Sequence, residues 1–100
     1  MPVIECKKET LWELLRQGTV LLDFWAPWCG VCRMMEPVVT AAAEETGAVI
    51  VRVNAEEEPE LAGQYGVMTL PAFVLLRDGE KAAFASGAKT KQALIDFLHS

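Results

Sequence analysis

The chain has 100 residues, of which 52% are hydrophobic and 23% charged, and its formal net charge is −5. This length and composition predict one globular domain over residues 1–100 and argue against a disordered chain. The acidic balance disfavours a nucleic-acid partner, because phosphate binding needs a basic surface. No apolar run reaches the roughly 18 residues of a membrane helix, and residues 1–10 lack a secretory apolar stretch, so we expect a cytoplasmic protein away from membranes.

Short apolar strands alternate with amphipathic helices along the chain. Strands are expected over residues 3–5, 20–25, 48–53, 72–76 and 81–86. Helices are expected over residues 10–18, 29–46 and 59–66, and after the capping residue Thr90. Strands that are separated by helices predict parallel pairing, and the turn at 77–80 predicts an antiparallel hairpin at one edge.

The helix over 29–46 carries an apolar face on which five residues fall at helical spacing: Met34, Met35, Val38, Val39 and Ala42. Pro37 lies inside this helix and removes one backbone donor, so it is expected to kink the helix and to serve its geometry.

The chain has three cysteines, Cys6, Cys29 and Cys32, and the last two form a C-x-x-C pair. A zinc site needs about four ligands, and Cys6 and His99 lie too far along the chain to complete one, so we expect no metal. A structural disulfide would close a very small loop and stabilise the fold little. A reactive dithiol fits better, because the strand-to-helix junction at Cys29 offers unpaired N–H groups that favour a thiolate.

The stretch DFWAPWCGVCRMMEP, residues 23–37, closely resembles the active-site segment of thioredoxins. The resemblance extends over the chain through residues 51–54, 65–71, 77–80 and 86–88. It implies an α/β thioredoxin fold, in which a central mixed five-stranded sheet of order 1-3-2-4-5 is flanked by four helices. It also implies the transfer of two electrons to protein disulfides, without a cofactor beyond the cysteine pair itself.

The resemblance implies a role for each cysteine. Cys29 is expected to be the exposed nucleophile that attacks a substrate disulfide, and Cys32 the buried thiol that resolves the mixed disulfide. The expected partners are disulfide-containing proteins and a thioredoxin reductase, flavin- or ferredoxin-linked, and the protein is expected to be a monomer. Two alternatives remain: an oxidase or isomerase of the same fold, and a non-catalytic thioredoxin-like binding subunit.

Two charged residues interrupt apolar strands. Asp23 is expected to be a buried carboxyl behind the cysteines that exchanges a proton with Cys32, and burial would raise its pKa. Arg52 stands where many thioredoxins have lysine, and its guanidinium would favour the ionised form of Asp23 if the two approached. Glu36, four residues after Cys32, is expected to lie on a solvated helix face and to pair with Arg33.

The remaining candidate residues come from the resemblance. Pro71 is expected to follow a cis peptide bond beside the cysteines, with Leu70 offering its backbone to a substrate strand. Trp25 is expected to be buried below the site. A flat apolar substrate surface is expected from five residues: Trp28, Gly30, Val31, Gly87 and Ala88. Val31 stands where most thioredoxins have proline, which restores a backbone N–H in the C-x-x-C loop.

Overall fold

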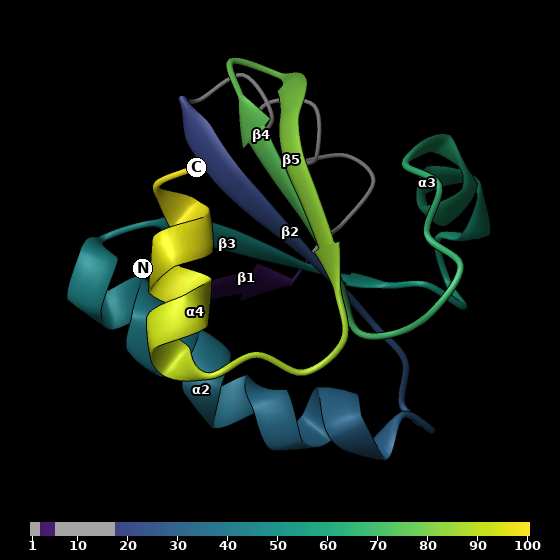
Figure 1. The fold of residues 1–100 in the computed structure, drawn as a ribbon. Helices are drawn as coiled ribbons and strands as arrows, with labels where there is room; N and C mark the ends of the chain where they lie inside the picture. Colours follow the sequence, from purple (N-terminus) through teal and green to yellow (C-terminus); the bar gives the residue numbers. More distant parts are fainter. Residues whose placement is uncertain (1–2, 6–17) are drawn as a thin grey trace.

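The computed structural model of the chain describes residues 3–5 and 18–100 (Figure 1). Five strands form one sheet: β1 (Val3–Glu5), β2 (Thr19–Trp25), β3 (Val49–Asn54), β4 (Ala72–Arg77) and β5 (Glu80–Ser86). The helices in the described ranges are α2 (Gly30–Thr46), α3 (Pro59–Gln64) and α4 (Lys91–Leu98). Cys6 and the helix predicted over 10–18 fall outside the described residues, Gly18 excepted.

The sheet order is β1-β3-β2-β4-β5, as the resemblance implies. β3 pairs in parallel with both β1 and β2, whereas β4 is antiparallel to β2 and to β5. The expectation that strands separated by a helix pair in parallel is therefore wrong for β4, which follows α3 but pairs antiparallel to β2. Ala72 at the start of β4 pairs with Phe24 near the end of β2, so the chain re-enters the sheet at the end where β2 and β3 finish. The short helix α3 does not carry the chain back along the sheet.

Helices cover both faces of the sheet (Figure 1). On one face α2 and α4 bury Leu21, Ile50 and Leu75. On the other face α3 packs on Leu22 and Val51. Alternate residues of the strands thus contribute to two separate hydrophobic cores, because successive side chains of a strand point to opposite faces of the sheet.

The ends of α2 follow the sequence signals. Cys29 is its N-cap, and Gly47 is its C-cap with φ of 73°, a conformation that favours glycine. The helix runs through Pro37. Met34 departs from the predicted apolar face, since 75% of it is exposed while Met35 beside it is buried. None of the helices in the described ranges has the length and apolar character needed to cross a membrane.

Candidate active site

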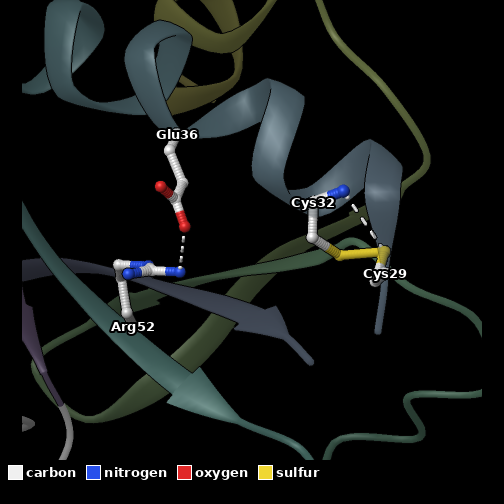
Figure 2. The surroundings of a disulfide bond; sticks show 4 residues. All are labelled: Cys29, Cys32, Glu36 and Arg52. Carbon is white, nitrogen blue, oxygen red and sulfur yellow. Dashed lines mark hydrogen bonds and ion pairs between the residues drawn. A yellow bond between two sulfur atoms is a disulfide. The ribbon is translucent and has the colours of Figure 1, made fainter. Parts of the chain in front are cut away.

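Cys29 and Cys32 form a disulfide at the N-terminus of α2 (Figure 2). Their Cα atoms are 5.3 Å apart. Cys29 has an extended backbone with φ of −86° and ψ of 102°, and its Sγ accepts a hydrogen bond from the backbone N–H of Cys32 at 3.2 Å. The sulfur of Cys29 thus takes the place of an N-cap oxygen, where helix N–H groups favour negative charge.

The cysteines are less exposed than the sequence predicts. Cys29 exposes 7% of its surface and Cys32 exposes 4%. The expectation of an exposed Cys29 is wrong for this oxidised form, because the disulfide packs against buried Ala26 and the half-buried Trp25 and Leu70.

Three charged residues line a hollow of about 100 Å³ beneath α2. Asp23 on β2 exposes 5% of its surface and lies in register with Arg52 on β3. Glu36 of α2 accepts a hydrogen bond on Oε1 from Nη2 of Arg52 at 2.9 Å (Figure 2). The predicted pairing of Glu36 with Arg33 is therefore wrong: Glu36 points toward the sheet, so its cation comes from a strand rather than from its own helix.

Trp25 connects this charged group to the disulfide. The guanidinium carbon of Arg52 lies 4.2 Å from the centre of the Trp25 ring, which is within cation–π range. Trp25 also packs against the cluster of Ala26, Cys29 and Cys32. Its indole Nε1 is buried and has no hydrogen-bond acceptor among the described residues. The indole thus contacts both the cation and the cysteines.

The segment before β4 lies beside the cysteines. The Leu70–Pro71 peptide bond is cis, and Leu70 contacts the disulfide cluster. The backbone N–H of Gly87 donates to the carbonyl of Pro71 at 2.9 Å. This bond places Gly87 next to the Leu70–Pro71 segment, of which Leu70 contacts the disulfide cluster.

The expected surface residues differ in exposure. Trp28, Gly30, Val31 and Ala88 are exposed, whereas Gly87 is half-buried. Beside them Trp28 and Leu70 line a groove of about 370 Å³ with residues that the sequence analysis did not single out: Val67, Met68, Ala62 and Pro59. Val67 and Met68, two apolar residues in the loop before Pro71, were the sequence signal that could have predicted this groove. No cluster of potential metal ligands occurs within residues 3–5 and 18–100.

Comparison with known proteins decides the family. A family model described as thioredoxin matches residues 2–100. A thioredoxin from Bacillus subtilis is 38% identical over 99% of this chain and 97% of its own length. A mutant thioredoxin from Halobacterium salinarum superposes with a TM-score of 0.86 at 36% identity, covering 98% of this chain and 87% of its own. The chain belongs to the thioredoxin family.

Membership in the thioredoxin family makes the chain a thiol–disulfide oxidoreductase, with the Cys29–Cys32 pair as its redox-active group. A second relative, thioredoxin 1 from a Nostoc species, is 44% identical over 79% of this chain and 76% of its own length. These findings confirm the predicted fold and activity. The roles of the surrounding residues follow as proposals.

Proposed function

We propose that this thioredoxin is a cytosolic dithiol electron donor that reduces disulfides in other proteins. The observation that carries the proposal is the position of the Cys29 sulfur at the N-cap of α2, where the N–H of Cys32 already donates to it. In the reduced protein this donor and the helix dipole favour the thiolate of Cys29. The thiolate is the form of cysteine that attacks a disulfide.

The reaction begins with a bond between the protein and its substrate. The Cys29 thiolate attacks one sulfur of a substrate disulfide, the substrate S–S bond breaks, and the other sulfur leaves as a thiolate that takes up a proton. Cys29 and the substrate then share a mixed disulfide. Cys32 lies one helical turn away at 5.3 Å between Cα atoms, so it can reach Cys29 without a large rearrangement.

The second step releases the substrate. Cys32 loses its proton and attacks the Cys29 sulfur, the mixed disulfide breaks, and the second substrate sulfur leaves as a thiolate. The Cys29–Cys32 disulfide forms, so two electrons have moved to the substrate. We assign the uptake of the Cys32 proton to Asp23, because its carboxyl group is buried on the sheet and a positioned carboxylate can serve as a general base.

Substrate contact falls to the segments that border the disulfide. Trp28, Gly30, Val31 and Ala88 supply an exposed surface on which an extended protein segment can lie. Leu70 packs against the disulfide cluster, and its backbone can pair with such a segment. Trp25, Pro37 and Arg52 support this site without contacting the substrate.

The oxidised protein needs a reductase to regenerate its dithiol. We assign this step to a thioredoxin reductase, in keeping with the family, and expect the chain to act as a monomer in the cytoplasm.

The proposal is tested by reduction of insulin disulfides with dithiothreitol as the electron source. Cys29→Ser abolishes turnover above the rate with dithiothreitol alone, and Cys32→Ser accumulates a mixed disulfide at Cys29. A matched control, Ser100→Ala, changes a small hydroxyl residue at an exposed position after α4 and keeps the rate. Full turnover by Cys29→Ser would show that Cys29 is not the nucleophile, and a wild-type rate no higher than that of dithiothreitol alone would contradict the redox role and favour a binding subunit.

The direction of electron flow is tested separately by the redox potential of the Cys29–Cys32 couple, followed by tryptophan fluorescence in thiol/disulfide buffers. A reductant has a potential well below about −230 mV, whereas a value near about −120 to −180 mV would indicate an oxidase or isomerase.

A further inference from the structure

Met68 holds a large apolar side chain in solvent close to the disulfide. It exposes 91% of its surface, more than Met34 at 75% or Trp28 at 68%. Methionine is an apolar residue that is usually found in a protein interior. A methionine this exposed gains almost no packing within its own chain, so the contacts that it can make are with a partner.

The loop that carries Met68 is fixed at both ends. On one side the backbone N–H of Val67 donates to the carbonyl of Ala62 in α3 at 2.9 Å, and Val67 packs against the hydrophobic core. On the other side Leu70 packs against the same core and against the disulfide cluster. Met68 and Thr69 lie between these anchors and are both exposed. The anchored loop thus presents Met68 at a defined place on the surface.

That place is the groove of about 370 Å³, which is continuous with the disulfide. Met68, Trp28 and Leu70 all line the groove. Trp28 precedes Cys29 in the chain, and Leu70 contacts the disulfide cluster. A protein segment joined to Cys29 that follows the groove would therefore cover Met68. The flexible thioether side chain suits a surface that must fit different protein segments.

We propose that Met68 is an oxidation site at which peroxide lowers the affinity of this thioredoxin for its protein substrates. The sulfur of Met68 takes one oxygen atom from hydrogen peroxide: the O–O bond breaks, an S–O bond forms, the sulfur loses two electrons and the remainder leaves as water. The resulting sulfoxide is polar, so covering it with an apolar segment costs free energy that the thioether does not. This inference rests on the proposed reduction of protein disulfides.

The other methionines of the described ranges differ from Met68. Met35 exposes 5% of its surface, and its Sδ accepts a hydrogen bond from the backbone N–H of Lys89 at 3.4 Å, so its sulfur is shielded from peroxide. Met34 is exposed on α2 but does not line the groove. Met34 is therefore the matched control: an accessible thioether away from the groove.

The test compares each protein before and after treatment with hydrogen peroxide. Peroxide is applied to the oxidised protein, in which Cys29 and Cys32 are bonded to each other and offer no thiol, and catalase then removes it. Peptide mass spectrometry locates each sulfoxide, and insulin reduction with dithiothreitol gives KM and kcat. A sulfoxide at Met68 raises the KM for insulin about tenfold, a loss close to the free energy of burying a methionine side chain. The kcat is kept, because the lost contact is made equally in the bound substrate and in the transition state.

Three variants make the result specific. Met68→Leu has no thioether at this position, so its KM after peroxide equals its own KM before treatment. Met34→Leu still shows the full rise in KM. Met68→Gln places a polar side chain in the groove and raises KM without peroxide. Oxidation at Met1 or Cys6 cannot explain these differences, because all three variants keep both residues.

Reversal provides a second measurement. A methionine sulfoxide reductase supplied with dithiothreitol returns the sulfoxide to the thioether, with two electrons taken from the dithiol and the oxygen released as water. This treatment restores the original KM of the wild-type protein. A KM that stays high after the sulfoxide at Met68 has been removed shows that another lesion is the cause.

Other results also overturn the proposal. Oxidation of Met34 that leaves Met68 intact contradicts the assignment of the reactive sulfur. A sulfoxide at Met68 without a rise in KM, an unchanged KM in Met68→Gln, or a rise that persists in Met68→Leu removes the link to substrate affinity. Insulin reduction that is normal before peroxide and unaffected by it contradicts this inference alone. Untreated protein that is no faster than dithiothreitol contradicts the proposed function as well, so the two failures are distinguishable.

Discussion

Gly87 has a φ of 86° and donates its N–H to Pro71, so one residue ties the end of β5 to the segment beside the cysteines. A Cβ at this position would meet no atom within 4 Å, so a substitution is penalised by backbone conformation alone. Gly87→Ala should lower the free energy of unfolding by about 1–2 kcal/mol. Urea unfolding of the two proteins measures this difference.

Gly63 provides the matched control for this substitution. It lies within α3, has no positive φ, and has equally open space around an added Cβ. Gly63→Ala should therefore raise the free energy of unfolding by up to about 1 kcal/mol, because alanine is the better helix former. A loss of stability in Gly63→Ala as large as in Gly87→Ala would show that the positive φ of Gly87 is not the cause.

Individual contacts were the hardest feature to predict from the sequence. Spacing of three residues on a helix suggested Arg33 for Glu36, but the partner is Arg52, sixteen residues away on β3. Likewise the low exposure of Cys29 depends on Leu70 and Trp25, which only the folded chain brings together. Motif chemistry identified the reactive pair, whereas its surroundings depend on long-range packing.

The end of α3 carries a group whose ionisation opposes folding. Tyr65 is the C-cap of this helix and packs beside Phe24, with ring centres 6.3 Å apart. Burial raises the pKa of Tyr65 above its ordinary value of 10.0. The folded state then holds its proton more tightly than the unfolded state. The stability from this group is complete below pH 10.0 and is lost as the pH rises through the folded pKa.

Tyr65 is the only tyrosine in the sequence, so phenolate absorbance reports on it directly. Its titration midpoint should be higher in the native protein than in concentrated urea. Tyr65→Phe should abolish the absorbance change and reduce the alkaline loss of stability. Equal midpoints in the native and unfolded states would refute the burial of this hydroxyl.

The bounds of helices and strands were predicted more accurately than the contacts between side chains. Apolar runs bounded by glycine and proline placed β2, β3, β4 and α2 to within one or two residues. The two-residue turn of Asp78 and Gly79, both at positive φ, matches the Asp-Gly hairpin signal. The direction of β4 was wrong, because a helical segment between strands specifies a crossover only when it spans the sheet.

At the scale of the whole molecule, stability rests on two apolar cores rather than on the disulfide. Cys29 and Cys32 are three positions apart, so their bond closes a very short loop. The chain-entropy model gives about 2 kcal/mol for such a loop. The oxidised protein should therefore exceed the reduced protein by about this amount in the free energy of unfolding.

Urea unfolding with and without dithiothreitol measures the difference. A double variant with Cys29→Ser and Cys32→Ser is the control, and its stability should not respond to dithiothreitol. An advantage of more than about 4 kcal/mol for the oxidised form would mean that the disulfide organises the fold. With the expected difference of about 2 kcal/mol, the protein can be reduced in each cycle without approaching the unfolded state.

The turn of the hairpin between β4 and β5 offers a site for a tag at a distance from the cysteines. β4 begins beside the cysteines and ends at the turn of Asp78 and Gly79, and its six residues span about 20 Å (Figure 1). Loop tips of this kind accept inserted residues. A short affinity or fluorescent tag placed in this turn would therefore immobilise or follow the protein while leaving the surface around Trp28 open to its partners.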